Sequence, residues 1–146
     1  MPENIVLVGL PGSGKTRVGR ALAEATGLAL IDLDHAFSAV HGIPPAQYIE
    51  NYGERAFRAL ESTIAQTPRH ASIIATGGGA VIDPISRWHL WHSGLVVWLD
   101  GDDELLHDRI DKGTHRPLTT SIAALRARRA ERTPFYAAAD LRLDAA

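Results

Sequence analysis

Short apolar runs alternate with amphipathic segments along most of this 146-residue chain. Four runs rich in β-branched residues have the length of buried strands, and a weaker fifth run follows near the end. These predicted strands span residues 5–8, 28–31, 72–76, 95–99 and 141–143. Helices are predicted between them, over residues 17–25, 53–66, 84–92, 102–110 and 122–136, with a further short helix that begins at Pro44 and Pro45.

This alternation predicts the α/β class, because strands connected through helices form a parallel sheet with helices on both faces. We expect a three-layer sandwich around a five-stranded parallel sheet, in a single domain over residues 1–146. Residues 111–121 show no periodicity and are predicted to form a mobile loop. In such sheets the ligand lies beyond the carboxyl ends of the strands, so the residues that follow each strand are the candidates for a site.

The segment after the first strand, residues 9–16, reads G-x-x-x-x-G-K-T, the P-loop pattern. We predict that Gly12, Ser13 and Gly14 turn their backbone N–H groups toward phosphate oxygens, at the positive end of the next helix. Lys15 is expected to reach the β- and γ-phosphates, and the Thr16 hydroxyl to bind Mg²⁺. A chance match in a glycine-rich turn is the alternative, and the strand–loop–helix context favours a nucleotide site.

Two carboxylates, Asp32 and Asp34, follow the second strand. In extended backbone both side chains would lie on the same side of the chain, near the phosphates. One is expected to hold Mg²⁺ and the other to orient or deprotonate an attacking hydroxyl group. The alternative for either residue is a cap on a helix near residues 36–40.

Arg58 and Glu61 are three residues apart on the helix predicted over 53–66, whose core stripe is Phe57, Leu60 and Ile64. Taken alone, this pair reads as a solvated ion pair worth about 0.2–0.5 kcal/mol. In the functional interpretation, Glu61 fixes the guanidinium of Arg58 so that it binds a substrate carboxylate with two hydrogen bonds.

A glycine triplet, residues 77–79, follows the third strand and would let a ligand lie against bare backbone at Gly78. Arg116 in the predicted mobile loop is a candidate to close over the nucleotide, and the alternative is an ordinary exposed arginine. Spacing alone does not distinguish Arg132 from its neighbours Arg126, Arg128 and Arg129.

The composition excludes several classes of protein. The chain has no cysteine, so thiolate chemistry, disulfides and cysteine–zinc sites are excluded. A net charge of −2, with no alternation of basic and aromatic residues, argues against nucleic acid. No stretch has the length of a membrane span or signal-peptide core, so we expect a cytoplasmic location.

The tryptophans Trp88, Trp91 and Trp98 are predicted to pack in the core or between helices and sheet. His89 and His92 are spaced so that they can share a metal ion, but without a third ligand a helix surface is the favoured interpretation.

Together these motifs resemble the shikimate kinase family, which has the nucleoside-monophosphate-kinase-like P-loop fold with a mobile lid. The resemblance covers nearly the whole chain, and the motifs occur in the family's order. They are GLPGSGKT at 9–16, DLD at 32–34, GERAFRALE at 53–61, GGGAV at 77–81, RPL at 116–118 and RTPFY at 132–136. The resemblance implies the reaction ATP + shikimate → ADP + shikimate 3-phosphate, in the biosynthesis of chorismate and aromatic amino acids, by a monomer.

The resemblance also assigns roles to matching positions. It implies that Lys15 and the lid residue Arg116 act on the ATP phosphates, and that Thr16 and Asp32 hold Mg²⁺. It implies that Asp34 engages the 3-hydroxyl of shikimate. The remaining residues implied to bind shikimate are Arg58, supported by Glu61, together with Gly78 and Arg132.

Two departures from the family pattern suggest alternatives. The chain stops at Ala146, where the family usually continues into an adenine-contacting loop and a terminal helix, and the segment between Arg116 and Arg132 is short. One alternative is therefore a binding or regulatory domain of this family without turnover. The other is a related sugar-acid kinase, such as a gluconate kinase, which would use the same phosphate-binding residues.

Overall fold

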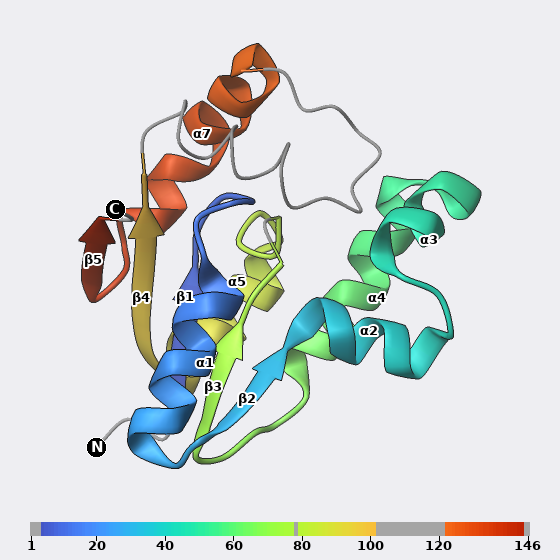
Figure 1. Ribbon diagram of the computed structural model, residues 1–146. Coiled ribbons are helices and arrows are strands. Elements are labelled where there is room, and N and C mark those ends of the chain that lie inside the picture. The colour runs from blue at the N-terminus through green and yellow to red at the C-terminus, as the bar shows by residue number, and fades with distance from the viewer. Residues whose placement is uncertain (1–3, 78, 102–121, 145–146) are drawn as a thin grey trace.

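The computed structural model describes residues 4–77, 79–101 and 122–144 (Figure 1). The strands are β1 (Asn4–Val8), β2 (Ala29–Asp32), β3 (Ser72–Ala75), β4 (Gly94–Asp100) and β5 (Leu141–Asp144). The helices are α1 (Lys15–Thr26), α2 (Leu33–His41), α3 (Pro45–Tyr52), α4 (Glu54–Gln66), α5 (Pro84–Ser93) and α7 (Ile122–Tyr136). All five predicted strands are present. The helix predicted over 102–110 and the mobile loop predicted over 111–121 lie outside the described residues.

β1 lies at the centre of a five-stranded sheet with the order β2-β3-β1-β4-β5. Every pairing is parallel, and Val6 of β1 pairs with Ile74 on one side and Val96 on the other. Figure 1 shows α1 across one face of the sheet and α5 across the other. The predicted three-layer α/β sandwich is therefore confirmed, and the strands' carboxyl ends share the upper edge of the sheet in this view.

The pleat of the central strand divides the core into two clusters, because alternate side chains point to opposite faces. Val6 belongs to the larger cluster, where α2, α4, α5 and α7 pack on the sheet. Leu7 belongs to the smaller cluster, under α1. Phe57, Leu60 and Ile64 of α4 all contact the larger cluster, which confirms the predicted core stripe.

The described helices are short and have well-defined ends. Gly27 ends α1 with φ 76°, and its N–H donates to the carbonyl of Ala23 at 2.9 Å, the arrangement of a C-cap glycine. The longest, α7, has 15 residues, whereas a bilayer span needs about 20 apolar residues. Within the described ranges, none of the helices combines the length and apolar character that a membrane crossing requires.

The three tryptophans differ in burial. Trp91 and Trp98 are partly buried and pack against the larger cluster, as predicted. The prediction for Trp88 is wrong, since its side chain is 57% exposed and stacks on His92 with the ring centroids 4.1 Å apart. The buried face of α5 is formed by other residues, including Leu90, which leaves Trp88 at the helix surface.

Candidate active site

The P-loop connects β1 to α1 at the carboxyl edge of the sheet. Gly14 precedes α1 with φ 93° and ψ 23°, a left-handed conformation that glycine adopts without steric cost. The loop closes with a hydrogen bond from Ser13 N to Leu10 O at 3.1 Å. Ser13 is almost completely buried, and its hydroxyl has no hydrogen-bond partner in the described part of the chain. The loop thus reaches the N-terminus of α1 with the geometry that the motif predicts.

Lys15, the first residue of α1, folds back over this loop. Its Nζ donates to Gly9 O at 2.6 Å and to Leu10 O at 3.2 Å. The ammonium group is therefore held above the turn of the loop, where an incoming anion can replace the two carbonyl groups as its hydrogen-bond partner.

Thr16 and Asp32 join the P-loop helix to the end of β2. The Thr16 hydroxyl donates to Asp32 Oδ2 at 3.0 Å. The other carboxylate oxygen, Oδ1, accepts from the backbone N–H groups of Asp34 at 2.9 Å and His35 at 3.2 Å, so Asp32 also caps α2. The alternative that Asp32 caps a helix is therefore confirmed, and the same carboxylate also accepts from Thr16. The two side chains present hard oxygen donors side by side, a set that fits Mg²⁺ with water completing its coordination.

Asp34 lies in the first turn of α2. The prediction that Asp32 and Asp34 share one side of an extended segment is wrong, because α2 begins at Leu33. The Asp34 side chain instead faces Gly77. A Cβ built on Gly77 would lie 2.8 Å from Asp34 Oδ1 and 3.0 Å from Glu61 Oε2. Two carboxylates from different helices thus meet at the end of β3.

Arg58 makes two ion pairs on α4. Its Nη1 donates to Glu61 Oε1 at 2.8 Å and its Nη2 to Glu54 Oε1 at 3.1 Å. The Glu61 side chain is only 8% exposed, against 66% for Glu54, so the Arg58–Glu61 pair is not a solvated surface pair. We therefore favour the interpretation in which Glu61 orients Arg58 for a substrate over that of a solvated ion pair.

The environment shifts the pKa values of this pair. Burial lowers the pKa of Arg58, but the carboxylates of Glu61 and Glu54 raise it by more, and the net shift is upward. Burial raises the pKa of Glu61; the Arg58 partner opposes this rise and the charge of Asp34 adds to it. The guanidinium of Arg58 therefore stays charged, whereas burial makes the charged form of Glu61 less favourable.

The glycine triplet lets the backbone approach Arg58 closely. A Cβ on Gly79 would overlap the Arg58 guanidinium, so a larger residue here would displace that group. Gly78, the predicted substrate contact, lies outside the described residues, as does Arg116.

Arg132 on α7 is distinguished from its neighbours by burial. It is 7% exposed, and its Nε has no hydrogen-bond partner among the described residues. Arg129, by contrast, donates to Asp100 Oδ1 at 2.8 Å. Arg132 is close enough to Glu61 for its charge to lower the pKa of that carboxyl. A buried guanidinium with an unpaired donor suits an anionic ligand.

Tyr136 is a site residue that sequence reasoning missed. It is 1% exposed and stacks on Trp98 with the ring centroids 5.8 Å apart. Burial raises its pKa to about 12, and a hydrogen bond from Arg132 opposes that rise. Its position four residues after Arg132, one helical turn along α7, is the signal that could have identified it.

The chain is similar to known shikimate kinases. A family model described as shikimate kinase matches residues 11–146. The shikimate kinase of Synechococcus sp. (strain CC9605) is 42% identical over 145 residues, which cover 95% of this chain and 72% of the relative. That of Symbiobacterium thermophilum is 44% identical over 143 residues, 93% of this chain and 82% of the relative. The solved structure of shikimate kinase from Acinetobacter baumannii in complex with shikimate matches with a TM-score of 0.89 and 37% identity, covering 97% of this chain and 82% of that one.

Proposed function

This chain belongs to the shikimate kinase family, and from that premise we propose that it transfers the γ-phosphoryl group of ATP to the 3-hydroxyl group of shikimate. The observation that carries the proposal is the cluster of Asp34, Arg58 and Glu61 beside a complete P-loop, with the buried Arg132 close to Glu61. The cluster supplies an acceptor for the attacking hydroxyl and two cations for the substrate carboxylate.

The donor half of the reaction uses the P-loop. The backbone N–H groups of Gly12, Ser13 and Gly14 bind the phosphates at the N-terminus of α1, where the helix dipole favours negative charge. Lys15 leaves its loop carbonyls to pair with the β- and γ-phosphate oxygens. These contacts hold the terminal phosphorus in line for attack, and positioning of this kind supplies most of the catalysis in phosphoryl transfer.

Thr16 and Asp32 are the residues that we propose for Mg²⁺. When bound, the metal ion neutralises charge on the phosphates. Asp32 is held in place for this role by the backbone N–H groups at the start of α2. The remaining proposed nucleotide contact, Arg116, rests on the family resemblance and would add positive charge over the transferring group.

Asp34 is the proposed base. Its carboxylate accepts a hydrogen bond from the 3-hydroxyl and takes up that proton as the new oxygen–phosphorus bond forms and the bond to ADP breaks. The charge of Asp34 adds to the rise in the pKa of the neighbouring Glu61, which comes mainly from burial. Arg58, oriented by Glu61, and Arg132 bind the carboxylate of shikimate, with Gly78 as a backbone contact.

A coupled ADP-release assay with an acceptor panel tests the proposal. We expect turnover with shikimate well above the rate without acceptor, and no comparable rate with gluconate. A preference for gluconate would identify a sugar-acid kinase instead. Calorimetric binding of shikimate with no ADP release above background would identify a binding domain without turnover.

A further inference from the structure

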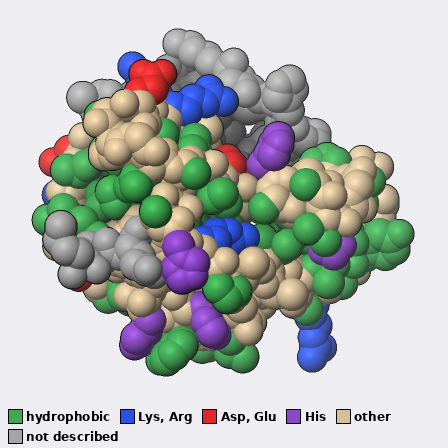
Figure 2. All heavy atoms as spheres, turned by 90° about the horizontal axis from the view of Figure 1, so that it is seen from below, with side chains coloured by type: hydrophobic (Ala, Val, Ile, Leu, Met, Phe, Trp, Pro, Cys, Tyr) green, Lys and Arg blue, Asp and Glu red, His purple; other side chains and the backbone are tan. Residues whose placement is uncertain are grey.

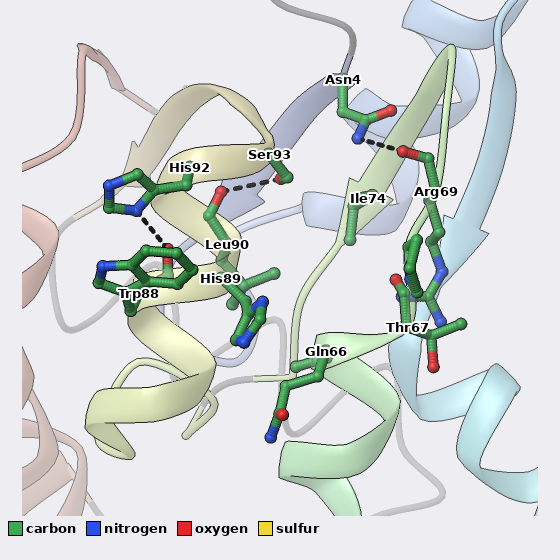
Figure 3. Close-up of a pocket in the computed structure, with 12 residues that line it drawn as sticks. Asn4, Gln66, Thr67, Arg69, Ile74, Trp88, His89, Leu90, His92 and Ser93 are labelled. Carbon is green, nitrogen blue, oxygen red and sulfur yellow. Dashed lines mark hydrogen bonds between the residues drawn. The ribbon is translucent and has the colours of Figure 1, made fainter.

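A second cavity lies at the opposite edge of the sheet from the P-loop. Its volume is about 280 Å³, and it opens between the end of α4 and the end of α5, beside the first residue of β1. Figure 3 shows Trp88 and His89 of α5 on one side and Thr67 and Arg69, which follow α4, on the other, with Asn4 at the top of the view. None of these residues takes part in the proposed reaction.

Among the residues that the structure describes, the lining of this cavity contains basic side chains and no Asp or Glu. Arg69, His89 and His92 line it together with neutral residues. In Figure 2, which looks at the molecule from below, histidine side chains gather on this face around a basic side chain. Such a surface favours an anion over a cation.

Arg69 has no carboxylate partner within the described part of the chain. Its Nη1 donates to the carbonyls of Ile64 at 2.9 Å and Thr67 at 3.0 Å, and no carboxylate among the described residues forms an ion pair with it. Burial lowers the pKa of Arg69, and none of the described carboxylates opposes that shift. In contrast, Arg58 and Arg129 each donate to a carboxylate. A partly buried guanidinium without an anion has donors to offer to a ligand.

Trp88 provides a second type of contact. Its indole is the most exposed large aromatic group at the cavity, at 57%, and His92 stacks against it at 4.1 Å. The His92 ring is itself positioned by its Nδ1, which lies 2.7 Å from the Trp88 carbonyl. The exposed indole offers a planar surface for an aromatic ring. The volume is just below the range of drug-sized sites, which suits a ligand with a single ring.

We propose that this cavity is a second binding site, for a small aromatic carboxylate whose acid group pairs with Arg69 and whose ring packs against Trp88. The charge of Arg69 selects the acid, and the indole selects a flat ring over a puckered one. The site is separate from the acceptor site, since its residues lie at the amino edge of the sheet and the P-loop and α7 at the other (Figure 1).

An NMR titration of the ¹⁵N-labelled full chain tests the proposal, with benzoate as probe and saturating shikimate present. We expect benzoate to shift the indole N–H signal of Trp88 saturably. The indole N–H of Trp91 is the internal control, because it donates to Ala138 O at 3.0 Å, away from the cavity, and should not shift. Benzamide, which lacks the charge, and cyclohexanecarboxylate, which lacks the flat ring, should each bind several-fold more weakly.

Two variants test the Arg69 contact and the Trp88 contact separately. Arg69→Gln should weaken benzoate binding about tenfold, and the exposed Arg20→Gln on α1 is the matched control that should leave it unchanged. Arg69 also donates to a carbonyl at the end of α4, so its replacement could disturb the fold, and Trp88→Leu is the second test. The exposed position of Trp88 should tolerate this change. Weaker benzoate binding by the Trp88 variant is then measured from the side-chain amide signal of Gln66, which also lines the cavity. Kinase activity should be unchanged in both variants. The proposal is wrong if benzoate leaves Trp88 unshifted, if benzamide binds equally well, if both variants bind as the unmodified chain does, or if shikimate displaces benzoate.

Discussion

Arg58 is held by two glutamates that differ in their surroundings. Glu61 is buried against the end of β3 and shares that space with Asp34, whereas Glu54 extends into solvent. A charge-assisted hydrogen bond fixes geometry best where water does not compete for the groups. We therefore attribute the orientation of Arg58 to Glu61 and give Glu54 a minor part.

Replacing Glu61 by Gln should raise the KM for shikimate about tenfold with little change in kcat, since the charge that orients Arg58 is lost. Glu54→Gln is the matched control, and its KM should change less than about twofold. Steady-state kinetics on the two purified variants measure both parameters. Equal effects of the two substitutions would contradict the separate roles of the glutamates.

Tyr136→Phe tests whether the phenol hydroxyl positions Arg132. Removing the hydroxyl takes away the hydrogen bond that Arg132 donates, and the KM for shikimate should rise about two- to tenfold while the KM for ATP stays constant. The ring and its packing on Trp98 are retained, so thermal stability should change little. A rise in both KM values, or a large loss of stability with neither KM changed, would indicate a purely structural role.

The positions of single residues were predictable from the sequence only where a motif fixes the backbone. The P-loop positions follow from their spacing, because the loop conformation itself creates the site. Arg132 could not be distinguished from Arg129, since the difference is the burial of one side chain and the Asp100 partner of the other. Trp88 shows the same limit, because periodicity does not reveal which residues already fill the buried face of α5.

The elements that carry the site are connected by Asp100 at the end of β4. Its carboxylate accepts from Arg129 of α7 at 2.8 Å and from Arg142 of β5 at 2.8 Å. Burial raises the pKa of Asp100, but these hydrogen bonds lower it by more, and the net shift is downward. This carboxylate therefore adds a polar link between the sheet and α7, the helix that carries Arg132, to the packing of α7 on the larger cluster.

Asp100→Asn should lower the free energy of unfolding by about 1–3 kcal/mol at neutral pH, mainly through Arg129. Since the folded-state pKa is depressed, the stabilisation by Asp100 is present above the ordinary aspartate pKa and is lost as the pH falls below about 4. The difference between the unmodified chain and the variant should therefore shrink in acid. Urea unfolding at several pH values measures it, with the exposed Asp144→Asn as control; a difference that is constant down to pH 2 would contradict the assignment.

The order of strands and helices was predictable because each buried strand is a continuous apolar run and each connecting helix has its own end signals. The start of α2 was not, because Asp32 serves both as the last residue of β2 and as the cap of the helix. The sequence shows the carboxylates but not that a helix begins between them. Asp34 consequently reaches its site from α2, and its approach to Glu61 depends on the packing of α2 on α4.

Substrate binding should stabilise the whole folded molecule against thermal unfolding. A ligand that binds only the folded state at one hundred times its Kd adds about 2.7 kcal/mol, or about 5–10 °C in Tm for a domain of this size. Shikimate should produce such a shift in the unmodified chain. Arg58→Ala should lose the shift with shikimate and keep the shift with an ATP analogue and Mg²⁺, as measured by differential scanning fluorimetry. Loss of both shifts would indicate a folding defect, and no shikimate shift in the unmodified chain would contradict the acceptor site.

The most direct test of the central claim is ³¹P NMR of the product formed from ATP and shikimate. We predict a new phosphate monoester on the 3-hydroxyl of shikimate, formed in step with ADP. With Asp34→Asn, we predict that its rate of formation falls by about 100-fold or more while ATP still binds. ADP formed without a shikimate ester, or an ester formed at the same rate by the Asp34 variant, would contradict the account.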